Sequence, residues 1–403
     1  MNKEKTLDFT QYINYVALAY AFVLPLSRAG VSFFTALLVL LWVFEGNFKS
    51  KIKRLLQNNV VIALCLFLIF NLISAVWTNE IQETLEYVGK YWFFLPIIVF
   101  FTSLQKEYIP KVTSAFILGM FISEVIAYGV FFDLWHFKHA TAANPSPFMH
   151  HIEYSVFLAF TALMLLSRIF NSSELKYKLL YSFFFITISG NLFLTAGRTG
   201  QIAYILGLFV LSIASFKNRF KALMISLILS IFVLGSAFNL SNTFHERVMT
   251  AKNSLVNVIE REDYCSSWGS RAGAWVVSKD IIVEHPLVGV GIVDNMKEFH
   301  TLIDTKYPQM KCVQANFMHM HNQYLQILTE LGIVGLILFL FIFYRIANIK
   351  LEEQEYRLMK YIYITVLLFS FVPEVIFHRQ FSMALFALII GLLLAESRTE
   401  NEV

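Results

Sequence analysis

Long runs of Leu, Ile, Phe, Val and Ala fill most of this chain, and short charged links separate them. A helix needs about 20 apolar residues to cross a bilayer, and backbone groups inside lipid must be hydrogen-bonded within the protein. The pattern therefore predicts an all-α polytopic membrane protein with about twelve transmembrane helices. They fall near residues 11–27, 29–45, 58–77, 90–104, 112–133, 151–168, 179–196, 199–216, 221–238, 323–346, 358–377 and 381–397.

One long polar segment, from Asn239 to Asn322, interrupts this pattern. Apolar residues at helical spacing predict two helices inside it, near residues 243–259 and 270–284, and His285-Pro286 ends the second. Gly289-Val-Gly291 follows as a predicted turn. The expected organisation is nine helices in residues 1–238, a helical loop domain in residues 239–322, and three helices in residues 323–403.

Basic residues are distributed unequally between alternate links. Nineteen Lys and Arg lie in the links of one side, five lie in the short links of the other side, and eight lie in the long polar segment. The positive-inside rule then puts both termini in the cytoplasm and the long segment outside. In a bacterium this is a multi-pass inner-membrane protein with a periplasmic loop.

Composition excludes several other classes of protein. The chain is 57% hydrophobic and 15% charged, whereas soluble domains are about half apolar and a quarter charged. The cytoplasmic links explain its net charge of +4, and the long polar segment carries eight basic and nine acidic residues, so no nucleic-acid surface is expected. The first apolar run lacks the small-residue cleavage site of a signal peptide.

The three cysteines have two different expected environments. Cys65 lies in a predicted span, where it would be a small apolar filler. Cys265 and Cys312 both lie in the long polar segment and could pair in an oxidising compartment. Their spacing alone does not show whether the two thiols meet.

Two arginines stand out by their position. Arg198 lies in the break Leu194-Thr-Ala-Gly-Arg-Thr-Gly200, where it either contacts lipid headgroups or binds a ligand that the flanking glycines allow to approach. Arg271 follows Ser270, a candidate cap whose helix start would favour an anion, although Arg271 could equally be an ordinary surface residue. Together, two guanidinium groups and a helix start suit a pyrophosphate.

A candidate general base lies where the chain re-enters the membrane. His321, followed by Asn322, has an imidazole that could accept a proton from a hydroxyl; the alternatives are a structural histidine at the interface and a metal pair with His319. No HExxH, CxxC or phosphate-binding loop is present, so no metal or nucleotide site is predicted. Further polar residues on the same outer face are candidates for substrate binding: Arg28, His151, Asn322, Arg379, and Glu374 near the end of the eleventh helix.

Four motifs occur in order on the outer face, and together they resemble the O-antigen ligase and polymerase superfamily of bacterial inner membranes. The twelve-helix layout with one long periplasmic loop is also similar, and the motifs extend over about Leu194 to Gly335. They are Thr195-Ala-Gly-Arg-Thr-Gly200, Ser270-Arg-Ala-Gly-Ala-Trp275, His285-Pro-Leu-Val-Gly-Val-Gly291 and His321-Asn-Gln-Tyr-Leu325.

The resemblance implies a glycosyltransferase of the GT-C kind that needs no cofactor. Its donor would be a sugar chain on undecaprenyl pyrophosphate and its acceptor the lipid A-core oligosaccharide, both embedded among membrane lipids. Arg198 and Arg271 match the family's essential arginines, His321 matches its histidine, and Glu374 matches an acidic position near the penultimate helix. The resemblance therefore implies transfer of the sugar chain with inversion at the anomeric carbon and without a metal.

Three other functions remain open. An O-antigen polymerase shares the motifs but commonly has a second sizeable periplasmic loop, whereas the segment Leu134 to His150 is short. A protein O-oligosaccharyltransferase would use a Ser or Thr acceptor. A transporter would require paired repeats and broken helices, and the sequence has neither.

Overall fold

The computed structural model describes residues 8–137, 139–315 and 317–398. Lys3, Lys5 and Lys138, which contribute to the charge count above, lie outside it. The described chain consists of helices and connecting turns, with two isolated β-bridges near residues 137–144. The prediction of an all-α protein is confirmed.

Nine helical segments of the described chain are long and apolar enough to cross a membrane. The three other predicted spans correspond to helices α1, α17 and α18, which are shorter, with 15, 17 and 17 residues. The bounds of these twelve segments are α1 Phe9–Val23, α2 Arg28–Glu45, α4 and η1 Asn59–Val76, α5 to α6 Ile81–Ser103, η3 and α7 Lys106–Phe131, α8 His151–Asn171, α9 Leu175–Leu194, α10 Arg198–Ser215, α11 Arg219–Leu240, α16 Gln323–Ala347, α17 Gln354–Ser370 and α18 Gln380–Glu396.

Helices α8 and α18 lie deepest in the bundle. Every residue of α18 from Phe381 to Glu396 is buried, and α8 packs against α9, α10 and α17. Phenylalanines fill much of this interior, among them Phe100, Phe157 and Phe371. Lipid is as apolar as these side chains, so close van der Waals packing holds the helices together more than water exclusion does.

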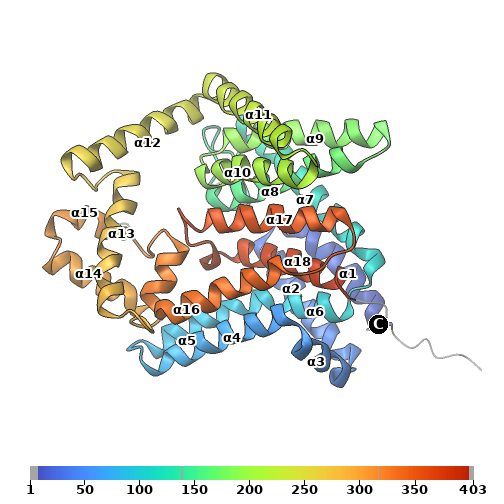
Figure 1. Cartoon of the computed structure of the whole chain (residues 1–403), viewed down its shortest axis with the longest axis horizontal. Coiled ribbons are helices and arrows are strands. Elements are labelled where there is room, and N and C mark those ends of the chain that lie inside the picture. Colours follow the sequence, from blue (N-terminus) through green and yellow to red (C-terminus); the bar gives the residue numbers. More distant parts are fainter. Residues whose placement is uncertain (1–7, 138, 316, 399–403) are drawn as a thin grey trace, which may run out of the picture.

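The long polar segment forms a small helical unit at one end of the bundle (Figure 1). It has its own apolar core, built around Val277, Phe299 and Met320. A disulfide joins Cys265 and Cys312, whose Cα atoms are 5.5 Å apart, so the two thiols do meet. The helices of this unit are α12 Asn242–Arg261, α13 Ser267–Glu284, α14 Asp294–Thr305 and α15 Lys311–Gln314.

The glycine motif after His285 packs against a break in α16. Gly332 interrupts that helix with a φ of +62°. Across the break, the Gly291 N–H donates to the Glu330 carbonyl at 3.0 Å, and the Ile333 N–H donates to the Pro286 carbonyl at 2.9 Å. A Cβ on Gly289 would lie 2.4 Å from the Glu330 carbonyl carbon, so no larger residue fits there. The motif therefore attaches the polar segment to the bundle.

Three local expectations were wrong. Helix α13 begins at Ser267 and is capped by Ser266, whose Oγ accepts from the Gly269 N–H, so Ser270 lies inside the helix. Helix α17 ends at Ser370, because Pro373 disfavours helical geometry just before it, and Glu374 therefore lies in the following loop.

The third concerns the glycines beside Arg198. They approach helix α8 rather than open space: a Cβ on Gly197 or Gly200 would collide with Ser155. The Gly200 N–H also donates to the Ser155 hydroxyl at 3.1 Å. The close approach that these glycines allow is therefore that of α10 to α8.

Candidate active site

The candidate residues lie at the end of the bundle where the polar segment sits. Helices α2, α8, α10, α16 and α18 all begin at this end. Gln323, the first residue of α16, holds the start of that helix against the segment after α17: its N–H donates to the Phe371 carbonyl at 2.8 Å, and its Oε1 accepts from the Phe377 N–H at 3.0 Å. The free N–H groups of helix starts favour an anion nearby.

Arg198 and Arg271 line one pocket, as their pairing in the sequence predicts. Arg198 comes from the first turn of α10 and Arg271 from the second turn of α13. Among the described residues neither forms an ion pair, and the Arg198 Nη1 and Arg271 Nε atoms are buried without a hydrogen-bond partner. Burial lowers the pKa of Arg271, whereas the negative charge of Glu374 raises it, and the guanidinium stays charged at neutral pH. Such a pocket fits an anion.

Two further residues of this pocket, Arg247 and Trp268, were not among the predicted site residues. Both predicted arginines lie over the Trp268 ring, Arg198 at 5.8 Å and Arg271 at 5.7 Å from its centroid. Trp268 precedes Arg271 by one helical turn, so both project from one face of α13. Arg247 lies among the apolar residues of α12, and that unexpected charge on an apolar face was the available signal.

An apolar groove continues from the arginine pocket between α10, α11 and α12. Arg198, Ile202, Arg247 and Trp268 belong to both. The rest of the groove is lined almost entirely by aliphatic and aromatic side chains: Ile205, Leu206, Leu234, Phe244, Val248 and Ala251. A molecule with an anionic group joined to a long apolar chain would fit the pocket and groove together.

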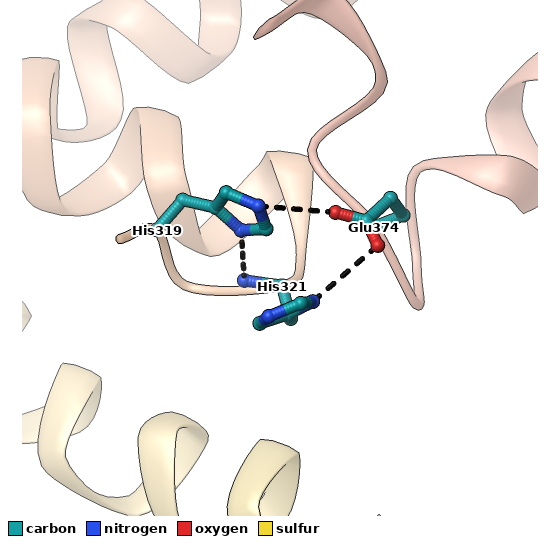
Figure 2. A group of neighbouring side chains, drawn as sticks. All are labelled: His319, His321 and Glu374. Carbon is teal, nitrogen blue, oxygen red and sulfur yellow. Dashed lines mark hydrogen bonds and ion pairs between the residues drawn. The ribbon is translucent and has the colours of Figure 1, made fainter. Parts of the chain in front are cut away.

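Glu374 joins two histidines on the other side of the site (Figure 2). His319 Nε2 lies 3.3 Å from one carboxylate oxygen, and His321 Nδ1 lies 3.4 Å from the other. Burial alone would raise the pKa of Glu374, but His321, His319 and Arg379 together lower it to about 2. Glu374 is therefore a charged, fully buried carboxylate between two imidazoles.

The His321 backbone is held in a sparsely populated conformation, with φ +46°. Its N–H donates to His319 Nδ1 at 3.2 Å. Since that nitrogen accepts a hydrogen bond, the proton of neutral His319 is on Nε2, facing Glu374. Burial lowers the pKa of His319 to about 4, so the neutral form holds at pH 7.

His319, His321 and Glu374 also form the type of donor set that can hold a metal ion, with all ligand atoms within 4.8 Å of one another. Two observations favour a proton-transfer role instead. His319 presents an N–H to the carboxylate rather than a lone pair, because its other nitrogen accepts the backbone hydrogen bond. In addition, Arg379 already lies 3.8 Å from Glu374 and brings a competing positive charge.

The remaining predicted residues surround these two groups. His151 lines the arginine pocket, and Arg379 contacts Glu374. Asn322 caps α16, because its Oδ1 accepts from the Tyr324 and Leu325 N–H groups, so that oxygen is occupied by the helix. Arg28 opens α2 and packs over Phe381 at 5.7 Å.

Residues 183–340 match a protein-family model described as O-antigen ligase. This match covers less than half of the chain and supports its placement in the O-antigen ligase superfamily. The chain is also 31% identical over 172 residues to an uncharacterized protein of Haemophilus influenzae (strain ATCC 51907 / DSM 11121 / KW20 / Rd), a match that covers 40% of this chain and 42% of that relative.

The matched stretch, residues 183–340, includes Arg198, Arg271 and His321, together with Arg247 and Trp268. Glu374 lies beyond its end, at residue 340. The structure nevertheless brings Glu374 into contact with His321, so the chain outside the matched region completes the group.

Proposed function

We propose that this protein is an O-antigen ligase. It transfers a polysaccharide from undecaprenyl pyrophosphate to a sugar of the lipid A-core oligosaccharide, at the periplasmic face of the bacterial inner membrane. The activity is that of an inverting glycosyltransferase of the GT-C kind, which requires neither a nucleotide nor a metal.

The observation that carries this proposal is the pocket lined by Arg198, Arg247 and Arg271, which has no acidic residue among its lining side chains. None of these three guanidinium groups forms an ion pair among the described residues, their charge matches that of a lipid pyrophosphate, and bidentate hydrogen bonds suit its oxygens. The apolar groove that opens from the same residues matches the polyprenyl chain. This combination favours a lipid-linked pyrophosphate as the donor.

In the proposed reaction, the acceptor hydroxyl oxygen attacks the anomeric carbon of the donor sugar. The bond from that carbon to the pyrophosphate oxygen breaks, and its electron pair leaves with the lipid pyrophosphate. The hydroxyl proton moves to Nε2 of His321, while Glu374 stabilises the imidazolium through Nδ1. The arginines stabilise the leaving anion, and the pyrophosphate linkage supplies the free energy.

Two features favour a periplasmic ligase over the alternatives. The Cys265–Cys312 disulfide is the kind of bond that persists in an oxidising compartment. The segment between α7 and α8, residues 132–150, is too short to be the second large loop common in polymerases that resemble this protein. A polymerase and a protein O-oligosaccharyltransferase therefore remain the second candidates.

The test uses a bacterial strain that lacks this protein and expresses variants at matched level. The variants Arg198→Ala, Arg271→Ala and His321→Ala should lose smooth lipopolysaccharide and accumulate lipid-linked polymer on gels. Lys252→Ala, which removes an exposed cation of α12, should behave as wild type. Normal ligation by all three site variants would contradict the mechanism, and a null strain that keeps one repeat unit on the core would identify a polymerase.

A further inference from the structure

A second cavity opens beside the arginine pocket and encloses about 630 Å³. Its walls come from the start of α2 and from the segment between α7 and α8. No Asp or Glu lines it among the described residues. The side chains that matter here are Arg28, Asn144, Ser146, Phe148, His150 and His151.

Three contacts tie this cavity to the candidate active site. His151 lines both the cavity and the arginine pocket. Asn144 Oδ1 accepts from the N–H of Ala196, which lines the arginine pocket, at 3.2 Å. The Gln380 side chain donates to the Arg28 carbonyl at 2.8 Å, and the preceding residue, Arg379, contacts Glu374. The cavity therefore borders the anion pocket through His151, and the neighbouring residues Gln380 and Arg379 connect its wall at Arg28 with Glu374.

The chemistry of the walls suits a carbohydrate. Hydroxyl, amide and imidazole groups can exchange hydrogen bonds with sugar hydroxyls, and Arg28 offers five N–H donors and forms no ion pair among the described residues. Phe148 supplies an apolar face for a pyranose ring and is supported by Phe137, whose ring centroid lies 5.7 Å away. The volume falls within the usual range of small-molecule sites, roughly 300–1,000 Å³.

The order of the apolar groove, the arginine pocket and the cavity indicates whether the donor or the acceptor sugar binds in the cavity. The apolar groove and the arginine pocket share four residues, and the arginine pocket and the cavity share His151, but the groove and the cavity share none. An inverting displacement requires the nucleophile to approach opposite the leaving group. We propose that this cavity binds the carbohydrate portion of the acceptor and directs its hydroxyl toward His321, an inference that rests on the proposed function.

Steady-state kinetics test this assignment on purified full-length protein in lipid nanodiscs. Lipid-linked polysaccharide is the donor and rough lipopolysaccharide the acceptor. Phe148→Ala and Arg28→Gln should each raise the KM for rough lipopolysaccharide about tenfold without raising the KM for the donor. Leu134→Ala, an exposed change in the same segment, should raise neither constant. A higher KM for the donor alone, or no change in either constant, would overturn the assignment.

A binding measurement keeps the assignment separate from the proposed reaction. A photocrosslinking amino acid in place of Phe148 should capture rough lipopolysaccharide without turnover, even in a protein that also carries His321→Ala. Capture of the lipid-linked donor, or of neither molecule, would reject the acceptor site. If the crosslinking variant captures rough lipopolysaccharide but the wild type never ligates it, the proposed reaction fails while the acceptor site stands.

Discussion

The substitution Glu374→Gln removes one negative charge from the centre of the candidate site and keeps the side-chain volume. The carboxylate is fully buried, and it faces His321 at 3.4 Å and His319 at 3.3 Å. A glutamine cannot supply the charge that a protonated His321 needs. It can also present an N–H to Nδ1 of His321, which would place the imidazole proton on the wrong nitrogen.

The magnitude follows from the geometry. At 3.4 Å and an effective dielectric constant of about 20, an imidazolium and a carboxylate attract each other by about 5 kcal/mol at most. Each ~1.4 kcal/mol of lost transition-state stabilisation costs a factor of ten in rate. We therefore expect kcat to fall about 1,000-fold, with a smaller effect on KM for either substrate.

The assay measures initial rates of ligation with purified protein in nanodiscs. The matched control is Glu355→Gln in α17, because Glu355 pairs with Arg168 at 2.9 Å, away from the site, and its loss should leave the rate near wild type. In a protein that already carries His321→Ala, Glu374→Gln should add little further loss, since the two residues act as a unit. A Glu374→Gln enzyme within tenfold of wild type would refute the reasoning, and so would additive losses in the double variant.

Four further predictions concern stability and metal dependence. Replacing Cys265 and Cys312 by Ser should destabilise the polar segment by about 4 kcal/mol in a chain-entropy treatment of its 47-residue loop, and hydrogen exchange in α13 to α15 would report it. The pKa of His319 is lowered to about 4 from an ordinary ~6.5, so on acidification the unfolded chain binds the extra proton at a higher pH than the folded protein does. Thermal stability should therefore decrease as pH falls from about 6.5 to 4, and it should decrease less in His319→Gln. Gly289→Ala should cost roughly 2–4 kcal/mol through overlap with α16, whereas Gly235→Ala, with open space around it, should be neutral or slightly stabilising. Dialysis against a chelator should leave ligation unchanged; loss that zinc restores would point to a metal at the histidine pair instead.

The bundle could be predicted from the sequence because lipid imposes a simple rule. A backbone inside a membrane must satisfy its own hydrogen bonds, so each apolar run of sufficient length becomes a helix. Local structure was harder to predict where two neighbouring residues could fill the same role. Both Ser266 and Ser270 can cap a helix, and Ser266 does so because its extended backbone points Oγ at the Gly269 N–H.

The arrangement of the site depended on contacts between distant parts of the chain. Arg198 was recognisable because an unneeded charge at membrane depth is costly, and Arg271 because it lies at a predicted helix start. The partnership of Glu374 with His319 and His321 was not, because it requires the loop after α17 to fold against the start of α16. Likewise, Arg247 reaches the pocket only because α12 packs beside α10 and α11.

The separation of charges in the site explains how strong cations and a base can work side by side. Glu374 could have neutralised one of the pocket arginines, which would have weakened the grip on an anion. Instead it contacts Arg379 and the two histidines, so Arg198 and Arg271 form no ion pair among the described residues. In the proposed reaction, each group then keeps the charge that its task requires: cations for the leaving pyrophosphate, and a carboxylate-supported imidazole for the incoming hydroxyl. If Glu374 instead paired with Arg271, both the arginine pocket and the base would be impaired. The pocket would lose part of its positive charge, and the His321 imidazole would lose the carboxylate that supports it.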